Sequence, residues 1–415
     1  MIGNWYILYA AAQFIVGPFG DKYGARKLLI VALLGTSFSC YMMSLAKSFF
    51  ELRLAWAMNG IFQAAAFPLM MKALSPWYDN EQRAIILGYW TTCQQIGGTV
   101  AVSLAGYIAA GGFDRTLLGD AENKTTWRDS FLLPAVVAAI AGIITFFMMV
   151  EHPSDVGLRA PKSKTSTSSN ASTKKPTNET NSKKLSYIDV ARLPYLINVG
   201  MAYFCIKLVR YTMLTWSISY LKDFHKYDTT EAANMSTLFD IGGAFGAVAC
   251  AMIAKSFFNG NRIKAVFVLC AVSGFCTGVY GYLASYGTIV NMIMLFVAGF
   301  MIAGPDSVLG GAACSDVCER AGYDTSVLTT ATGIANGMGS VGAILAGSGP
   351  VWVKNQYGWN GLFVCAGGLA FVGALCLLPL VYNYNENKNS KKNTSQSKSG
   401  KIPHKHRRSK SKKRQ

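Results

Sequence analysis

The sequence predicts an all-α membrane protein, on the evidence of its apolar composition, its long apolar runs and the location of its positive charge. Of its 415 residues, 51% are hydrophobic and only 14% are charged, which is too apolar for a soluble chain of this length. Apolar runs of about 20 residues, enough for a helix to cross a hydrocarbon core of about 30 Å, recur along nearly the whole sequence. A barrel would show short alternating segments instead.

Eleven runs meet this length and composition, and we predict a transmembrane helix for each. The predicted spans are 3–20, 28–46, 54–75, 83–111, 130–150, 194–221, 232–256, 264–284, 290–317, 325–352 and 359–383.

A polar segment divides these spans into five and six. Residues 159–186 are Ser, Thr, Asn and Lys with hardly any side chain to bury, as in a flexible linker. Transporters built from two similar halves hold their substrate between them, so a first half of five helices suggests that one helix is missing before Met1. The predicted regions are an N-terminal bundle (1–151), a cytosolic disordered linker (152–190), a C-terminal bundle (191–384) and a basic disordered tail (385–415).

The net charge of +18 lies mainly outside the spans. Lys and Arg accumulate in cytoplasmic loops, and with alternating spans the loops 20–27 and 255–264 fall on the same side as the linker and the tail. That side is therefore predicted to be cytosolic, with the tail near anionic lipid rather than nucleic acid. The outer loop 112–129 then carries a candidate glycosylation site at Asn123.

No pattern in the sequence predicts an enzyme. The stretch GMGSVG (337–342) matches a dinucleotide-binding spacing, but it lies inside an apolar run that no strand precedes. Close helix packing explains it better, as it does the small residues Gly242 and Gly246. No Walker loop, zinc-ligand spacing or Ser-His-Asp set is found, so we predict neither a cofactor nor a metal.

Two cations lie inside one predicted span. Lys207 and Arg210, in CIKLVRYTMLTW (205–216), are three residues apart and share a helix face. A charge at the centre of a span costs roughly 2.5–3.5 kcal/mol on insertion scales, so both cations need a partner. One alternative is an acid on a neighbouring helix; the other is a bound anion, since the planar fork of Arg matches phosphate oxygens. The candidate acids are Asp240, Asp306 and Asp316.

The loop GPFGDKYGARK (17–27) resembles the loop signature of the major facilitator superfamily, and other stretches resemble its organophosphate:phosphate antiporters. This resemblance implies two pseudo-symmetric helical bundles and a gate held closed by the loop. The gating residues it implies are Gly17, Asp21, Lys22, Gly24 and Arg26. The stretches that carry the narrower resemblance are NGIFQAAAFPLMMKALSPWYDNEQRAIILGYWTTCQQIGG, EHPSDVGL, KLVRYTMLTWSISYLKD, FNGNR, GFMIAGP and YGWNGLF, and GPDSVLGGAACSD is most similar to the eukaryotic group.

The same resemblance implies exchange of a sugar phosphate or glycerol 3-phosphate for inorganic phosphate by alternating access. Arg210 matches one of the two phosphate-binding arginines of bacterial members, and the other belongs to the missing first helix. Lys207 would support Arg210, with Tyr211 beside it. Gln13 and Gln94 stand where bacterial members have Lys and His, and both can hydrogen-bond a phosphate or a sugar hydroxyl.

Two other functions remain open. In a proton-coupled carrier of another small organic anion, Asp240 or Asp306 would pair with Lys207 and titrate. In a nontransporting receptor or scaffold, the basic tail would bind a partner. The eukaryotic relatives and the final residues KKRQ, which fit a retrieval signal, favour the endoplasmic reticulum, and we expect a monomer.

Overall fold

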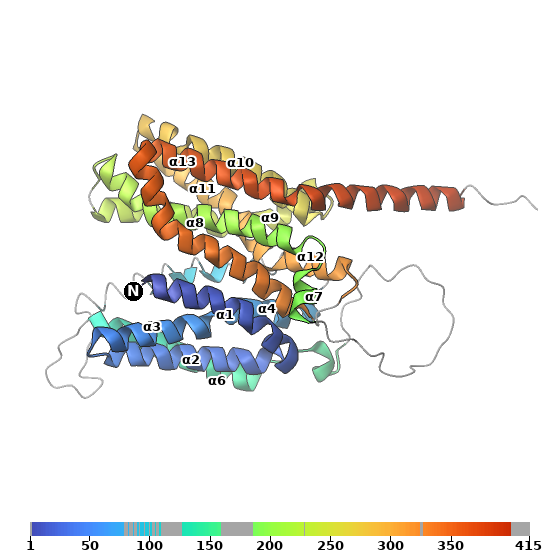
Figure 1. Ribbon diagram of the computed structural model, residues 1–415, viewed down its shortest axis with the longest axis horizontal. Coiled ribbons are helices and arrows are strands. Elements are labelled where there is room, and N and C mark those ends of the chain that lie inside the picture. The colour runs from blue at the N-terminus through green and yellow to red at the C-terminus, as the bar shows by residue number, and fades with distance from the viewer. Residues whose placement is uncertain are drawn as a thin grey trace, which may run out of the picture.

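A computed structural model describes residues 2–78, 127–158, 186–227, 229–323 and 327–399, together with single positions between 79 and 126. Every regular element in these ranges is a helix. Figure 1 shows two bundles side by side, one containing α1, α2, α3, α4 and α6 and the other α8 to α13.

The N-terminal bundle is built from long helices joined by short turns. Its elements are α1 (Ile2–Tyr23), α2 (Ala25–Leu45), α3 (Phe49–Ala64), α4 (Ala66–Leu74), the 3-10 turns η1 (Ser75–Trp77) and η4 (Trp127–Phe131), and α6 (Leu132–Met148). Ser48 begins α3 with a capping box, in which its side chain accepts from the Glu51 amide and Glu51 accepts from the Ser48 amide.

The C-terminal bundle follows two short elements, η5 (Pro153–Val156) and α7 (Tyr187–Ala191). One of its helices contains a π-helical turn, and the last one is broken at Gly358, whose φ is 70°. Its elements are α8 (Leu196–Asp223), α9 (Thr229–Phe257), α10 (Arg262–Leu283), the 3-10 turn η7 (Ala284–Tyr286), α11 (Thr288–Ser307), the π-turn η8 (Val308–Ala312), α12 (Ala313–Arg320) and α13 (Leu328–Ser399).

The predicted all-helical membrane fold is confirmed in the described residues. Each predicted span except 83–111 coincides with a helix, and most of 83–111 lies outside the described residues, as do Asn123 and the linker 159–185. In the part of the chain that the structure describes, seven helical stretches are long and apolar enough to cross a membrane. The last of them, Leu328–Tyr382, covers most of the predicted spans 325–352 and 359–383, and Gly358 lies between these two spans.

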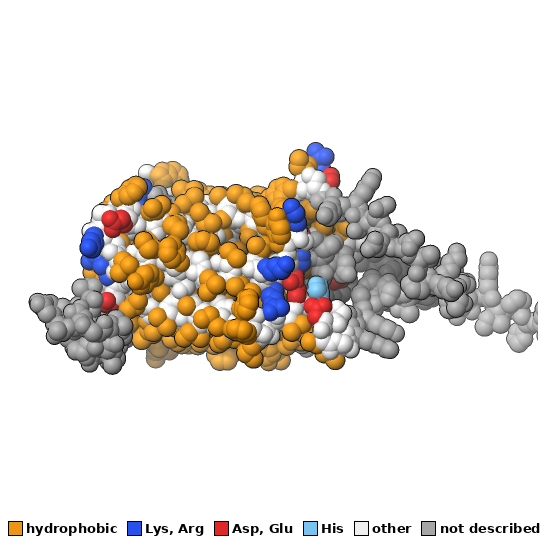
Figure 2. All heavy atoms as spheres, turned by 90° about the horizontal axis from the view of Figure 1, so that it is seen from below, with side chains coloured by type: hydrophobic (Ala, Val, Ile, Leu, Met, Phe, Trp, Pro, Cys, Tyr) orange, Lys and Arg blue, Asp and Glu red, His pale blue; other side chains and the backbone are white. Residues whose placement is uncertain are grey.

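The outer surface is that of a protein immersed in lipid. Figure 2 shows apolar side chains across the middle of the molecule and charged side chains gathered toward its two ends. On α6, Ile140, Ile144 and Phe147 all point outward and are at least half exposed. In water such a face would be an extended apolar patch, whereas in a bilayer it contacts acyl chains.

The small residues of α9 pack as the sequence predicts. A Cβ added at Gly242 or Gly246 would collide with the backbone of Phe296 or Phe300 on α11. Close approach of two helix backbones requires glycine at these positions.

The structure of the first part of the tail differs from the prediction. We expected residues 385–415 to be disordered, but α13 continues to Ser399. No Gly or Pro interrupts residues 385–399, so nothing in the sequence ends the helix before Gly400.

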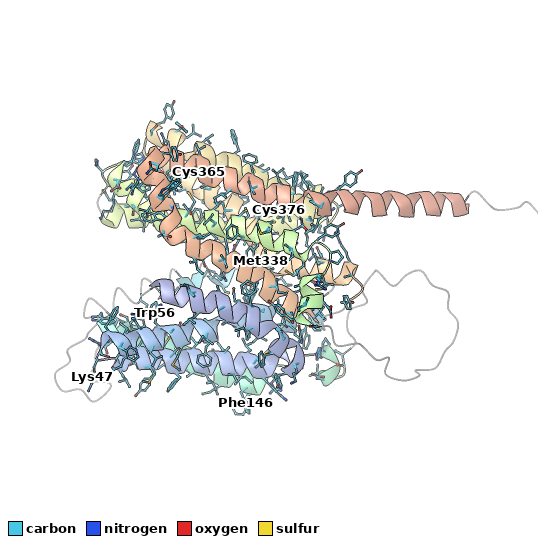
Figure 3. All side chains as sticks on the ribbon, viewed as in Figure 1. Lys47, Trp56, Phe146, Met338, Cys365 and Cys376 are labelled. Carbon is cyan, nitrogen blue, oxygen red and sulfur yellow. The ribbon has the colours of Figure 1, made fainter. Side chains whose placement is uncertain are left out.

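Two names are used below for the ends of the molecule. The linker side is the end at which α1 finishes and α7, α12 and the start of α13 lie (Figure 1). The far side is the opposite end, where Figure 3 places Lys47 between α2 and α3. The sequence predicts that the linker side faces the cytosol.

Candidate substrate site and inter-bundle contact

Lys207 is a buried cation in the middle of α8. It is 8% exposed, and its ammonium nitrogen lies 4.9 Å from the centre of the Tyr203 ring. Among the described residues no carboxylate lies within ion-pair distance of it. The face of an aromatic ring stabilises a desolvated ammonium group by about 2 kcal/mol. This is less than the cost of a charge within a membrane span, so the ring does not replace a counter-ion.

Arg210, one turn further along α8, has a different environment. Its Nη1 donates to Oδ2 of Asp306 in the last turn of α11, and the two side chains are 11% and 8% exposed. The other carboxylate oxygen, Oδ1, is buried without a hydrogen-bond partner. The pair joins two helices of the same bundle, so the C-terminal bundle alone holds both cations and this acid.

The structure thus decides between the three acids that the sequence offered. Asp306 pairs with Arg210, and Asp316 lies 3.3 Å from Arg262 on the linker side. Asp240 is half-buried on α9, within electrostatic range of Arg210. In this conformation the crossing of α8 and α11 brings Asp306 to Arg210, and Lys207 lies within its electrostatic range without forming an ion pair with it.

A glycine of α13 makes room for Lys207. A Cβ added at Gly339 would lie 2.9 Å from Lys207 Cδ and from Tyr203 Cδ1. The neighbouring Met338 faces Gly200 on α8, and Figure 3 labels it where these helices meet. Lys207 is therefore confined between its own helix and α13.

The predicted ligand Gln13 lies in the contact between the bundles. It is fully buried on α1, and Ser340 of α13 donates a hydrogen bond of 2.6 Å to its Oε1. Its Nε2 is buried without a hydrogen-bond partner. Ser340 follows Gly339 directly, so α13 contacts Lys207 with one residue and Gln13 with the next.

The other two predicted ligands, Tyr211 and Gln94, differ in how they lie relative to Arg210. Tyr211 is half-buried beside Arg210 on α8 and lies within its electrostatic range. Gln94 is exposed, and in the described part of the chain no contact joins it to Lys207 or Arg210. Its helix lies largely outside the described residues.

Asp21 of the loop signature connects the two bundles on the linker side. It accepts hydrogen bonds from the Thr329 and Thr330 amides at 3.2 and 2.9 Å, and from Thr330 Oγ1 at 2.5 Å. These amides belong to the first turn of α13, where they have no partner within the helix and the helix dipole is positive. One carboxylate therefore caps a helix of the opposite bundle.

Close packing and a second cation accompany this cap. A Cβ at Gly17 would lie 2.6 Å from Thr330 Cα, so only glycine permits the approach of α1 to α13. Lys72 of α4 donates to the Gly20 carbonyl at 2.9 Å and to Asp21 at 3.3 Å. The proximity of Lys72 to Asp21 depends on how α4 crosses α1.

The remaining loop residues act within their own bundle. Gly24 has a φ of 87°, which favours glycine, and turns the chain so that Glu151 accepts from the Ala25 amide at 2.7 Å. Arg26 Nη2 donates to the Phe146 carbonyl at 2.5 Å, at the end of α6. The predicted Lys22 is exposed and lies over the Tyr23 ring at 5.0 Å, so in the described residues Lys72 is the cation that meets Asp21.

Comparison with known proteins agrees with this architecture. The glucose-6-phosphate exchanger SLC37A2 of Bos taurus is 25% identical over 408 residues, covering 91% of this chain and 79% of the relative. A putative glycerol-3-phosphate transporter 1 of Arabidopsis thaliana is 25% identical over 396 residues, covering 90% and 72%. The crystal structure of the E. coli fucose:proton symporter FucP superposes with a TM-score of 0.65 at 12% identity, covering 90% of this chain and 89% of that one.

The relatives agree with the narrower resemblance found in the sequence, since both named above are called exchangers or transporters of a phosphorylated molecule. The match to the Major Facilitator Superfamily covers residues 1–347, and this range is most of the chain. This chain belongs to the Major Facilitator Superfamily.

Proposed function

We propose that this protein exchanges an organophosphate, a sugar phosphate or glycerol 3-phosphate, for inorganic phosphate by alternating access to one site near Lys207 and Arg210. The single observation that carries this proposal is Lys207, a cation buried in the membrane-spanning part of α8 without a carboxylate partner among the described residues. An anion has to compensate it, and a phosphoryl group supplies about two negative charges at pH 7.

The part in phosphate binding that we propose for Arg210 differs from the one that the sequence predicts. The sequence assigns it the main contact with phosphate, but in this conformation Asp306 occupies its Nη1. We therefore assign first contact with the phosphoryl group to Lys207, followed by Arg210, whose planar fork matches phosphate oxygens.

We propose that the contacts around Asp21 stabilise a conformation in which the site is closed to the linker side. Asp21 joins α1 to α13 on the linker side, Gln13 joins the same two helices further into the membrane, and both contacts cross between the bundles. We propose that rocking of the bundles breaks these contacts and opens the site to that side, and that Gly17, Asp21, Gly24 and Arg26 hold it closed until then.

The names of the relatives support the choice of substrate class. Glucose 6-phosphate, sugar phosphate and glycerol 3-phosphate appear in the names of the relatives that span at least 90% of this chain. A phosphoryl group is common to all three, which fits a site built around cations.

The experiment is counterflow in proteoliposomes. Vesicles loaded with inorganic phosphate should take up labelled phosphate, and external glucose 6-phosphate or glycerol 3-phosphate should compete with it. Lys207→Gln should lower the rate by about tenfold or more, since the lost charge contact exceeds about 1.4 kcal/mol. Lys255→Gln, at the exposed end of α9, is the matched control. Uptake that does not depend on Lys207 would contradict the proposal.

For the membrane, we propose the endoplasmic reticulum, which the resemblance to eukaryotic exchangers favours, and a monomer as the transport unit, since one chain contains both bundles. A fluorescent fusion should coincide with a marker of that membrane. Coincidence with a plasma-membrane marker would contradict the assignment.

A further inference from the structure

The contact that closes the linker side joins one face of α1 to one face of α13. A Cβ added at Gly20 would collide with Thr329 Cγ2, and one at Gly333 would lie 2.7 Å from the Gln13 carbonyl oxygen. The contact extends along α13 from Thr329 to Ser340, a length of about 16 Å at 1.5 Å per residue. Substrate cannot pass between the two helices in this conformation.

Two polar groups in this contact are buried and, in the described part of the chain, have no hydrogen-bond partner. They are Oγ1 of Thr329 and Nε2 of Gln13, and both residues are fully buried. The Thr329 side chain faces the N-terminal bundle, because its Cγ2 lies against Gly20 of α1. A buried polar group without a partner has lost its hydrogen bonds to water, so each of the two raises the free energy of the closed conformation.

Other groups in the same contact have their partners and favour closure. Asp21 accepts from the Thr329 and Thr330 amides, and Ser340 donates to Gln13 Oε1. The contact therefore combines hydrogen bonds that hold it closed with two groups that gain partners only when it opens.

Separation of α1 from α13 would place Thr329 and Gln13 on facing walls of the opening. A hydroxyl and an amide can then hydrogen-bond to water or to the oxygens of a phosphorylated substrate. Valine has nearly the shape of threonine, so packing in the closed contact does not require the hydroxyl of Thr329.

We infer that Thr329 and Gln13 line the route by which the phosphorylated substrate leaves to the linker side, and that the hydrogen bonds they gain there speed the opening of the loaded carrier. The inference rests on the proposed function. It gives Thr329 a role in release, separate from the binding of the phosphoryl group at Lys207 and Arg210.

The expected effect on the rate follows from the balance of these hydrogen bonds. Opening breaks the contacts of Asp21 and Ser340 between the bundles, and hydration of Thr329 and Gln13 offsets part of that cost. Without this offset the closed conformation gains stability relative to the open one, and each cycle of exchange takes longer.

The test is Thr329→Val, which removes the hydroxyl and keeps the amide that donates to Asp21. Exchange of labelled phosphate in proteoliposomes, with saturating phosphate on both sides, should slow about tenfold, since a buried hydroxyl without a partner no longer opposes closure. Labelled phosphate should bind to the purified variant no more weakly than to the wild type, because Lys207 and Arg210 are unchanged. Thr329→Ser keeps the hydroxyl and should slow exchange far less.

A second variant shows whether the slower exchange comes from closure. Asp21→Asn weakens the opposing contact between α1 and α13. The double variant Asp21→Asn/Thr329→Val should therefore exchange phosphate faster than Thr329→Val alone.

Thr277→Val is the matched control. Thr277 Oγ1 is also fully buried and has no partner among the residues that the structure describes, but α10 packs within the C-terminal bundle. Both substitutions remove a hydroxyl without a partner, so both should raise the unfolding temperature in detergent. Only Thr329→Val should slow exchange.

Any of four outcomes would overturn the inference. They are exchange by Thr329→Val at the wild-type rate, equal slowing in Thr277→Val, phosphate binding by Thr329→Val that weakens in proportion to its exchange, and a double variant no faster than Thr329→Val. A wild-type protein that neither binds nor exchanges phosphate would instead contradict the proposed function, so the two failures are distinguishable.

Discussion

At the scale of residues, Lys207 and Arg210 show how two cations one turn apart acquire different roles. Arg210 has a carboxylate partner, and Lys207 has a ring face and a confined space next to Gly339. The sequence predicts that both cations need compensation, and it names Asp306 among three acids. The choice of acid depends on how α8 crosses α11, which a local pattern does not contain.

Gly339 gives a test of the position of Lys207 that leaves its charge intact. In Gly339→Ala the new methyl group would meet Lys207 Cδ and Tyr203 Cδ1 at 2.9 Å, so the lysine side chain has to shift. We expect the KM for phosphate to rise about tenfold, since a displacement of about 1 Å has effects of this size or larger. Initial rates of exchange measure it.

The control for this change is Gly347→Ala on the same helix, where nothing lies within 4 Å of the added Cβ. Both variants exchange Gly for Ala within α13, so helix propensity changes alike. Equal KM values for the two variants would show that confinement of Lys207 does not matter.

At the scale of elements, the contact between α1 and α13 explains what the loop signature does in this chain. Asp21 caps α13 at its first turn, while Arg26 and Glu151 bind helix ends within the N-terminal bundle. The loop therefore has one residue that connects the bundles and two contacts that fix its own position.

Removal of the Asp21 charge should loosen the linker side. Asp21→Asn weakens a cap that is worth about 1–2 kcal/mol and loses the ion pair with Lys72. In a background without native cysteines, a Thr332→Cys reporter on α13, buried in the wild type, should react about fivefold faster with a membrane-impermeant thiol reagent supplied to the linker side.

Asp155→Asn serves as the matched control. Asp155 accepts from the His152 amide in η5 on the same side and contacts nothing in the C-terminal bundle among the described residues. An unchanged reaction rate in Asp21→Asn would show that the cap on α13 does not keep the linker side closed.

The packing of α9 against α11 leads to a prediction on stability. In Gly246→Val the side chain would collide with the backbone of Phe300, and overpacking of this kind costs about 1–3 kcal/mol. The unfolding temperature in detergent should therefore fall clearly below that of Gly368→Val, where nothing lies within 4 Å of the added Cβ. Similar melting of the two variants would mean that the close approach of α9 and α11 adds no stability.

Much of the fold at this scale follows from the sequence. The length and apolarity of the runs predict the helices, and Gly242 and Gly246 predict a close helix contact. The break of α13 at Gly358 falls between the predicted spans 325–352 and 359–383. The π-turn after Asp306 was not predicted, because an apolar run carries no signal for a change in helix type. The role of Lys72 was missed for a related reason, since it depends on a crossing of helices far apart in sequence.

At the scale of the whole molecule, two helical bundles lie side by side and share an apolar outer surface (Figures 1 and 2). Helix α13 contacts the cations of its own bundle and also forms polar contacts with the other bundle. Gly339, which leaves room for Lys207, and Ser340, which joins the bundles through Gln13, are neighbours on α13. Occupation of the site and closure of the linker side are therefore linked through the part of α13 before Gly358.

The central claim is that a phosphoryl group compensates Lys207, and equilibrium binding tests it most directly because it requires no movement of the bundles. Labelled inorganic phosphate should bind saturably to the purified wild-type protein and to Lys255→Gln, whereas Lys207→Gln should bind at least about tenfold more weakly. Equal affinity in Lys207→Gln and the wild type would contradict the account.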